Sequence, residues 1–331
     1  MDLVLHLLAL TAGFFFLIKG ADFFVVSAAS IARKFHVSTL IIGLTLVAFG
    51  TSLPELAVSF AASISARQQG MTADIAIGNI VGSNMANLTL ILGFTALMAP
   101  VMVRKSLFKK EFPILLVSAI LITVMAMFFQ ADLAIVWWEA LILLSVFVLY
   151  VVMVLKSPKD VLPEGEIEVI DMKKAIVLLV VGLAGVTAGG YAVTWGAESL
   201  ALNFLVSTFS MDPGKATTLV GLSIVALGTS LPELVTSIVA AKKGENEIAL
   251  GNVVGSNIFN TVLVVGLSGS VVSLGMNNDV IFDMFIVIAV TMLVILFAWT
   301  KKVITRFEGL ILALLYVLYI VFIIVRSSGL F

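Results

Sequence analysis

The sequence has no cysteine and only two histidines, His6 and His36. These absences exclude disulfides, thiolate metal sites and a histidine-rich zinc site. Charged residues are also scarce, at 12% of the chain, whereas they make up about 25% of a soluble domain. Hydrophobic residues account for 61% of the 331 residues, and the mean hydropathy is +1.20. This composition is typical of an integral membrane protein.

Ten apolar segments are long enough for a membrane-spanning helix, which needs about 20 mostly apolar residues. We expect these spans at 3–30, 38–65, 72–99, 111–129, 133–155, 173–205, 216–241, 246–273, 279–299 and 305–326. The longest polar connection, 156–172, divides them into two groups of five. No basic residue precedes the first apolar run, so we expect a retained span there and not a cleaved signal peptide.

Basic residues fix the expected orientation, because cytoplasmic loops retain Lys and Arg. With both termini outside and the central loop cytoplasmic, all but four of the 19 basic residues fall in cytoplasmic loops. The four others are Lys19, Arg67, Lys215 and Arg326. One missed or false span would spoil this alternation, so the charges support ten spans independently. Lys19 is expected to pair with Asp22 in the first span or to extend to the membrane surface.

The two groups of spans share two sequence motifs. AFGTSLPEL at 48–56 matches ALGTSLPEL at 226–234, and GNIVGSN at 78–84 matches GNVVGSN at 251–257. Each copy of the second motif is followed by a further asparagine, Asn87 or Asn260. Identities of this length indicate an internal repeat.

Each repeat has five spans, and five is an odd number. The second copy must therefore cross the membrane in the opposite sense to the first. The sequence predicts an all-α polytopic membrane protein with two inverted five-helix repeats, 1–155 and 173–331, joined by the cytoplasmic loop 156–172. In inverted-repeat transporters the substrate site lies at the repeat interface near the midplane.

The first motif places a carboxylate midway along a span in each half, at Glu55 and Glu233. An intramembrane carboxylate is costly and by default marks a functional site. The alternative is a protonated or hydrogen-bonded Glu that only ties helices together, and two copies in identical surroundings favour the functional interpretation. Two ionised carboxylates neutralise one Ca²⁺ in a low-dielectric centre. Nothing basic lies near the motifs, which disfavours an anionic substrate.

Pro54 and Pro232 predict a break in the second and the seventh span. Proline has no N–H, so carbonyls near residues 50–51 and 228–229 lose their helical partners. In a membrane such carbonyls must be satisfied by protein, water or an ion. Together with the neighbouring hydroxyls and carboxylates they form an all-oxygen set, as Na⁺ and Ca²⁺ require. The alternative is a simple proline kink.

The second motif adds polar side chains from the third and eighth spans. Ser83 and Asn87 are four residues apart and share a helix face, as do Ser256 and Asn260. The alternative is that small polar residues only pack the helices together. The other asparagines of the motif are expected to form interhelical hydrogen bonds, with only a weak claim to the site. They are Asn79, Asn84, Asn252 and Asn257.

The paired GTSLPE and GN-x-x-GSN segments resemble the alpha repeats of sodium/calcium exchangers, within the cation/Ca²⁺ antiporter superfamily. The closest resemblance is to compact prokaryotic members with ten spans. The matching segments are 43–59 and 78–93 in the first half, and 221–237 and 251–266 in the second. The resemblance implies a Na⁺/Ca²⁺ antiporter of the cell (inner) membrane that is not an enzyme and needs no cofactor. Its expected partners are Ca²⁺, Na⁺ and the lipid bilayer, with no nucleic acid and no obligatory protein partner.

The resemblance also implies four clustered cation sites, one favouring Ca²⁺ and flanked by Na⁺ sites. Glu55 and Glu233 would be the shared central ligands, and the carbonyls of Thr51 and Thr229 would add to the Ca²⁺ site. The inner Na⁺ site would be lined by Ala48, Ser52, Ser83 and Ser230, the outer one by Ala226, Thr229 and Ser256, and the middle position would face Asn87 and Asn260. The first and sixth spans would slide across the remaining core to alternate access.

Many family members have Asp where this chain has Asn260, so two formal carboxylates stand here in place of three. We therefore predict K⁺ independence, because K⁺-dependent members resemble the Asp pattern. The nearest alternative is a proton/Ca²⁺ antiporter, but such relatives carry an acidic residue where this chain has Val81 and Val254. A passive cation channel and an intramembrane enzyme are further alternatives. The inverted repeat and broken helices favour a carrier, and no nucleophile–base pair appears in the sequence.

Overall fold

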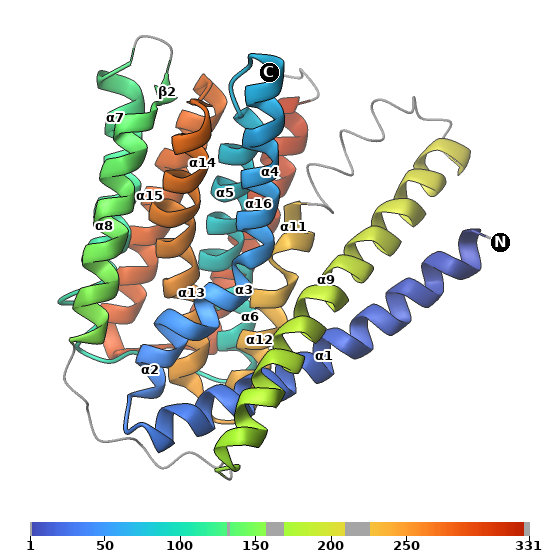
Figure 1. Cartoon of the computed structure of the whole chain (residues 1–331), viewed down its shortest axis with the longest axis vertical. Coiled ribbons are helices and arrows are strands. Elements are labelled where there is room, and N and C mark those ends of the chain that lie inside the picture. Colours follow the sequence, from blue (N-terminus) through green and yellow to red (C-terminus); the bar gives the residue numbers. More distant parts are fainter. Residues whose placement is uncertain (1, 131–132, 157–168, 209–225, 328–331) are drawn as a thin grey trace.

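The computed structural model describes residues 2–130, 133–156, 169–208 and 226–327, which form a bundle of long helices (Figure 1). Within these residues, eight helices are long and apolar enough to cross a membrane. A bent pair, Thr39–Thr51 with Leu53–Gln69, brings the number to as many as nine. The predicted span 216–241 begins outside the described residues. Most of the predicted cytoplasmic loop 156–172 also lies outside them.

The helices follow the order of the predicted spans. The first half comprises α1 (Asp2–Lys34), α2 (Thr39–Ile42), η1 (Gly43–Val47), α3 (Ala48–Thr51), α4 (Leu53–Gln69), α5 (Asp74–Ala86), η2 (Asn87–Ile91), α6 (Leu92–Met98), β1 (Val101–Met102), α7 (Glu111–Phe128), β2 (Ala134–Ile135) and α8 (Trp137–Leu155). The second comprises α9 (Met172–Thr208), α11 (Ala226–Thr229), α12 (Leu231–Lys242), α13 (Asn246–Ile258), η4 (Phe259–Val264), α14 (Val265–Val271), β3 (Leu274–Gly275), α15 (Asn278–Lys301), β4 (Val303–Ile304) and α16 (Arg306–Ser327). The η segments are π-helical.

Two composite helices form the centre of the bundle. The most apolar stretch of α13–η4–α14 is 100% buried, and that of α5–η2–α6 is 83% buried. The corresponding stretches of α1, α8, α9 and α16 are only 28% buried. A helix that is apolar all round needs other helices on every side. The GN-x-x-GSN motifs therefore lie in the core, and the peripheral helices present their Phe, Leu and Val side chains outward.

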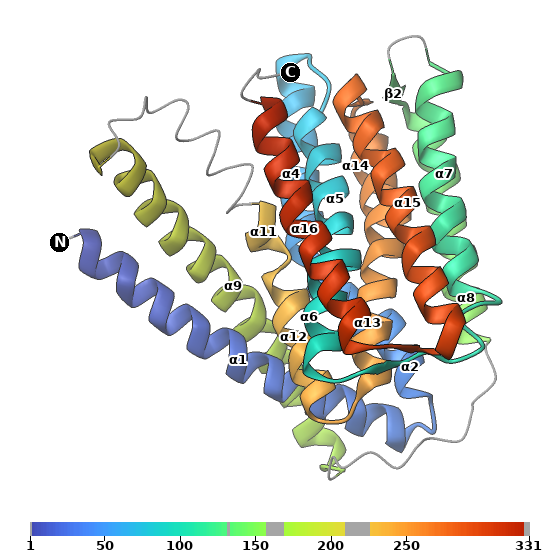
Figure 2. The ribbon, with the colours of Figure 1, turned by 180° about the vertical axis from the view of Figure 1, so that it is seen from behind.

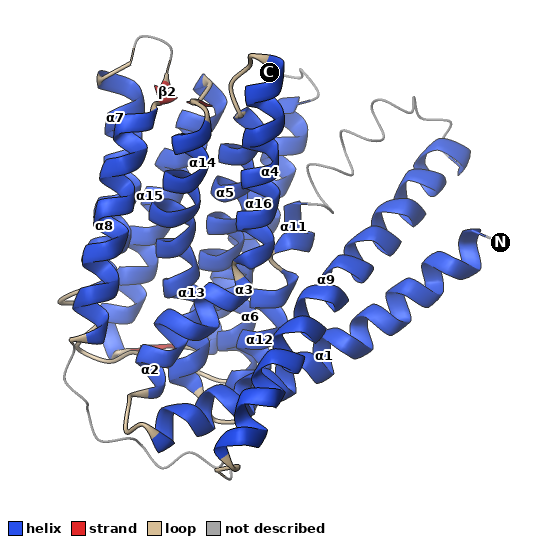
Figure 3. Cartoon of the chain, viewed as in Figure 1, coloured by secondary structure: helices blue, strands red, loops and turns tan. Residues whose placement is uncertain are grey.

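Two small antiparallel sheets lie at opposite ends of the central helices, in addition to the predicted all-α fold (Figure 3). β1 follows α6 and pairs with β4, which precedes α16. β3 follows α14 and pairs with β2, which precedes α8, next to the start of α5. Each sheet thus joins the end of the central helix of one half to the start of the last helix of the other half. The two sheets lie at opposite ends of the bundle.

The basic loops meet at the end of the bundle that carries the β1–β4 pair. Arg33 forms an ion pair with Glu245, and Arg104 forms one with Glu247. Burial raises the pKa of Glu245, while the nearby Arg33 opposes that rise. Four segments far apart in the sequence, near residues 33, 104, 245 and 303, therefore converge on one face. This grouping agrees with the loops that the charge pattern places together.

Helices α1 and α9 pack against each other through glycines and diverge from the bundle toward the start of α1 (Figures 1 and 2). A Cβ atom at Gly20 would lie 2.6 Å from the backbone nitrogen of Val186. A Cβ atom at Gly182 would lie 2.6 Å from the backbone nitrogen of Phe24. No side chain fits at these distances, so the two backbones touch only because the residues are glycine.

The second half of α1 covers the basic end of the core. An apolar cluster joins it to η1, α12 and α13 and comprises Phe24, Val25, Ala28, Ala29, Val47, Ala240, Ala241, Ile248 and Ala249. Two ion pairs flank the cluster, Arg33 with Glu245 and Asp22 with Lys243 at 2.6 Å. Asp22 therefore pairs with the turn between α12 and α13 and not with Lys19. We call these four charged residues the α1 latch.

Loss of the α1 latch is expected to expose the apolar cluster from the basic end. Arg33→Ala with Asp22→Ala removes both ion pairs, each worth about 1 kcal/mol or less for partly exposed groups. A combined loss of about 1 kcal/mol raises the open population about fivefold. Because the chain has no cysteine, an Ala240→Cys background allows the labelling rate with a membrane-impermeant maleimide to be measured.

Lys109→Ala is the control, because Lys109 is an exposed cation in another loop on the basic side. It should leave the labelling rate unchanged. Equal labelling of the double variant and the parent protein from the basic side would contradict a closing role for the α1 latch.

Candidate cation site

The helix that carries Glu55 is broken at Ser52. Helix α3 ends at Thr51, α4 begins at Leu53, and the two parts are bent by 45°. Ser52 has φ −82° and ψ 3°, in the sparsely populated region where many active-site residues lie. Pro54, in the first turn of α4, has no N–H to offer to the preceding turn. The break therefore lies where the proline predicts it.

The second half repeats this geometry around Glu233. Ser230 has φ −90° and ψ 3°, between the end of α11 at Thr229 and the start of α12 at Leu231. Glu55 and Glu233 both stand in the first turn of the helix that follows the break. The N-terminus of a helix carries partial positive charge and favours an ionised carboxylate. Each break thus gives its own glutamate a favourable electrostatic position.

The two breaks meet across the interface between the halves. The Ser52 hydroxyl donates to Oε1 of Glu233 at 3.2 Å, and the Ser230 hydroxyl donates to Oε1 of Glu55 at 3.2 Å. Ser83 adds a contact of 3.4 Å to the same oxygen of Glu55. Both glutamates have no exposed surface. One buried site therefore contains both carboxylates, each contacted by a serine from the other half.

Thr51 and Ser256 adjoin this pair. Their hydroxyl oxygens are 3.5 Å apart, and the Ser256 hydroxyl donates to the Ala48 carbonyl at 3.5 Å. α13 comes this close because a Cβ at Gly255 would lie 2.8 Å from the Leu44 carbonyl oxygen. The Ser256 side chain is therefore held against the first broken helix.

Thr229 immediately precedes Ser230 at the end of α11, and its hydroxyl donates to Oδ1 of Asn79 at 3.4 Å. The backbone of Ala226 begins the same short helix. The structure therefore brings the predicted residues of both breaks to one region of the core.

Asn87 and Asn260 lie in the two π-helical segments of the central helices. η2 begins at Asn87 and packs against α12, while η4 contains Asn260 and packs against α4. Short π-helical segments are frequent at functional sites. Both amides are fully buried, and their oxygen and nitrogen atoms have no hydrogen-bond partner among the described residues.

The second carboxylate oxygen of each glutamate is also buried without a hydrogen-bond partner among the described residues. These atoms are Oε2 of Glu55 and Oε2 of Glu233. Buried polar atoms in proteins are almost always bonded. These two oxygens and the two asparagine oxygens are therefore suited to contact a cation or water.

Two asparagines lie closer to the site than the sequence indicated. Nδ2 of Asn252 donates to the Glu233 carbonyl at 3.4 Å, and Oδ1 of Asn252 accepts from Thr51 at 2.9 Å. Asn79 is placed in the same way between α4 and α11. The sequence held a signal for both, because each precedes the motif serine by four residues and so shares its helix face. Asn84 forms the expected interhelical bond, with Thr261 of η4, whereas Asn257 donates to the Val253 carbonyl within its own helix.

The chemistry of the site is that of a hard cation. Its oxygens come from two carboxylates, several hydroxyls and asparagine amides, and no Lys or Arg is bonded to either glutamate in the described structure. No three acidic or histidine side chains gather among the described residues. Ca²⁺ takes six to eight oxygens in flexible geometry, and two carboxylates balance its charge.

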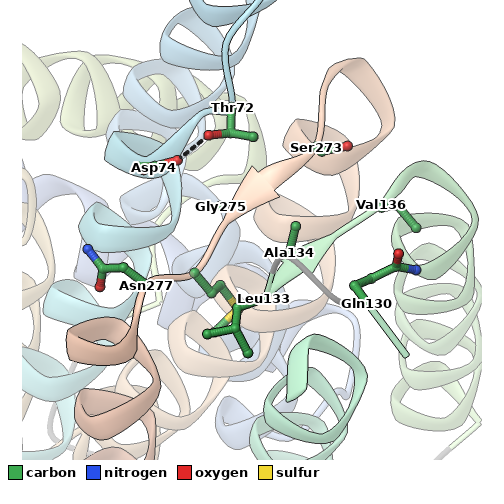
Figure 4. A pocket seen from close by; sticks show the side chains of 10 residues that line it. Thr72, Asp74, Gln130, Leu133, Ala134, Val136, Ser273, Gly275 and Asn277 are labelled. Carbon is green, nitrogen blue, oxygen red and sulfur yellow. Dashed lines mark hydrogen bonds between the residues drawn. The ribbon is translucent and has the colours of Figure 1, made fainter. Parts of the chain in front are cut away.

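The cavities lined by described residues do not include the glutamates. An apolar cavity of about 490 Å³ lies between α4 and α9 and is lined by Leu53, Pro54 and Thr187, beside the turn that carries Glu55. A second, of about 670 Å³, lies at the end with the β2–β3 sheet (Figure 4). Asp74 is the one acidic side chain that lines it within the described residues, and its carboxylate accepts from Thr72 at 2.6 Å.

Comparison with known proteins identifies the family. The model of the sodium/calcium exchanger protein family matches the chain twice, over residues 5–156 and 174–325. The putative antiporter CaxA of Alkalimonas amylolytica is 37% identical, covering 93% of this chain and 95% of its own length. The sodium/calcium exchanger MaX1 of Methanosarcina acetivorans is 34% identical, covering 96% and 98%.

A solved structure of the sodium-calcium exchanger NCX_Mj, soaked with zero Na⁺ and Ca²⁺, has the same fold. Its TM-score is 0.81 at 32% sequence identity, with 97% of this chain and 99% of that chain covered. The chain therefore belongs to the sodium/calcium exchanger family. It is a multi-pass membrane protein and a cation/Ca²⁺ antiporter by family.

The two glutamates are expected to be essential for Ca²⁺ binding. Glu55→Gln and Glu233→Gln each remove one of the two charges that face the cation. Each should weaken binding at least about tenfold, because an interaction with a charged group is worth about 1.5–3 kcal/mol. Isothermal titration of the purified protein with Ca²⁺ measures this effect.

Glu139→Gln is the matched control, since Glu139 is also fully buried but lies in α8, where it caps the helix by accepting from the Val136 N–H. Binding should survive this change. Wild-type affinity in both Glu55→Gln and Glu233→Gln would refute the assignment of the site.

Proposed function

We propose that this protein is a secondary active antiporter that exchanges Na⁺ for Ca²⁺ by alternating access at one shared site. The observation that carries the proposal is the reciprocal pair of contacts from Ser52 to Glu233 and from Ser230 to Glu55. Because each broken helix supplies its serine to the other's carboxylate, Na⁺ and Ca²⁺ would compete for the same two charges.

Exchange follows from the charge of this site. With neither cation bound, two carboxylates in an apolar core resist a change of exposure, because moving uncompensated charge through such surroundings is costly. Either Ca²⁺ or Na⁺ removes that cost, so the protein would change its access only when loaded. Several Na⁺ per Ca²⁺ would make the exchange electrogenic.

The proposed architecture is ten spans in two inverted five-helix repeats, 1–155 and 173–331, with the loop 156–172 between them. Its support is the correspondence between the halves: a break before each glutamate, a π-helical segment in each central helix and one β-pair at each end. Since the basic loops share one face, we place that face in the cytoplasm and both termini outside the cell (inner) membrane.

The proposed ligands keep the assignment that the family resemblance implies. They are Glu55, Glu233, the carbonyls of Thr51 and Thr229, the residues Ala48, Ala226, Ser52, Ser230, Ser83 and Ser256, and the amides of Asn87 and Asn260. Na⁺ is favoured over H⁺ because Val81 and Val254, at the positions where proton-coupled relatives carry an acid, are buried and apolar.

The choice between Na⁺ and H⁺ can be tested with ⁴⁵Ca²⁺ uptake into proteoliposomes. Uptake should follow an outward Na⁺ gradient and should increase when the interior is made positive, since net positive charge leaves with the Na⁺. A pH gradient without Na⁺ should drive none. Uptake driven by pH alone would instead indicate a proton antiporter, and uptake driven only by membrane potential would indicate a channel.

Exchange is expected to be independent of K⁺, because Asn260 supplies no third carboxylate for a further cation. Replacing K⁺ by choline on both sides of the membrane should leave the initial rate of Na⁺-driven uptake unchanged. Asn260→Asp, which adds the missing charge, is the comparison variant. A wild-type protein that transports only when K⁺ is present would contradict this prediction.

A further inference from the structure

We infer that Asn79 and Asn252 are positioning residues, each of which clamps the threonine at one helix break to the glutamate-bearing helix of the opposite half. The inference rests on the proposed function, because the threonines and glutamates it connects belong to the proposed cation site. Neither asparagine is among the proposed ligands. Their role is to hold the two broken helices at the separation that the reciprocal serine–glutamate contacts need.

The orientation of the Asn252 amide is fixed by its partners. Nδ2 donates to the backbone carbonyl of Glu233 at 3.4 Å and to the Ser237 hydroxyl at 3.0 Å. A carbonyl only accepts, so the nitrogen must face α12 and Oδ1 must face Thr51, whose hydroxyl lies 2.9 Å away. One side chain thus joins the backbone of Glu233 to the end of α3.

Asn79 connects the equivalent serine and threonine in the other half. Its Nδ2 donates to the Ser59 hydroxyl at 3.1 Å, and its Oδ1 accepts from Thr229 at 3.4 Å. Ser59 stands one helical turn after Glu55, as Ser237 stands one turn after Glu233. The two clamps share a threonine and a serine as partners, and Asn252 adds the bond to the Glu233 carbonyl. Because both halves repeat the threonine and serine contacts, the clamps are not a by-product of packing at one place.

The clamp also determines which acceptor the Thr51 hydroxyl donates its hydrogen bond to. The Thr51 hydroxyl is 2.9 Å from Asn252 but 3.2 Å from the Val47 carbonyl and 3.4 Å from the Ala48 carbonyl. The shortest contact is the preferred hydrogen bond. Because the Thr51 hydroxyl donates to Asn252, it does not compete with the Ser52 N–H and the Ser256 hydroxyl, which donate to the Ala48 carbonyl at 3.0 Å and 3.5 Å.

A double-mutant cycle tests the clamp. Thr51→Val should raise the half-saturating Ca²⁺ concentration about fivefold to tenfold, as expected for one buried hydrogen bond. Asn252→Ala, which also removes the bonds to Glu233 and Ser237, should raise it at least as much. The maximal rate should change less than the affinity. The double variant should be no weaker than the weaker single variant, because both changes remove the same connection. Effects that multiply in the double variant would overturn the inference.

Asn84→Ala is the matched control, since Asn84 is a buried asparagine of the same motif that also bonds across the halves, to Thr261 at 2.9 Å. It should leave the Ca²⁺ affinity unchanged. A loss of affinity equal to that of Asn252→Ala would mean that Asn252 only packs the helices together, which would contradict the clamp. The pair Asn252→Ala with Thr229→Val, which breaks two different clamps, should show multiplied effects.

Protein quality is checked by size exclusion and by the unfolding temperature without Ca²⁺, which a positioning role leaves near that of the wild type. If Asn252→Ala does not fold, the cycle of Asn79→Ala with Thr229→Val decides. Failure of both alanine variants to fold assigns a packing role and overturns the inference. A wild-type protein that binds Ca²⁺ but shows no Na⁺-driven uptake would count against the proposed function alone. The clamp would then still be tested, because the same double-mutant cycle can be measured as Ca²⁺ affinity by calorimetry.

Discussion

The structure depends on the burial of two carboxylates in the middle of an apolar bundle. Such groups are tolerated only when dipoles and polar partners surround them. Here each carboxylate stands at the first turn of a helix, and its hydroxyl partner comes from the other half. The helix breaks, the close approach of α13 to the first broken helix and the asparagine clamps all serve to bring these partners into place.

Much of this arrangement could be predicted from the sequence, because the membrane allows few backbone structures. A long apolar run must form a helix, and the proline in the fifth position of each GTSLPEL segment must disturb it. The duplicated motif then indicated that Glu55 and Glu233 belong together. The structure confirms the breaks at Ser52 and Ser230 and the meeting of the two motifs. The full ten-span inverted repeat and the individual ligands stay predictions.

What the sequence did not reveal depends on contacts between distant residues. The bond from Asn252 to Thr51 joins residues 201 positions apart, and no local periodicity encodes it. Asp22 has Lys19 within one turn yet pairs with Lys243, because α1 packs against α12. The two-residue strands and the π-helical turns are too short to leave a pattern, and tertiary packing decides them.

The glycine contact between α1 and α9 has a mechanical consequence. Two backbones in direct contact leave no side chains between them to absorb a displacement, so the helices behave as one rigid body. When that body lies against the core at the basic face, as α1 does through its latch, it stands away from the core toward the opposite face (Figure 2). In the alternating access that we propose, a single rigid body that slides across the core uncovers one face only as it covers the other, which makes simultaneous opening, and hence a leak, geometrically unfavourable.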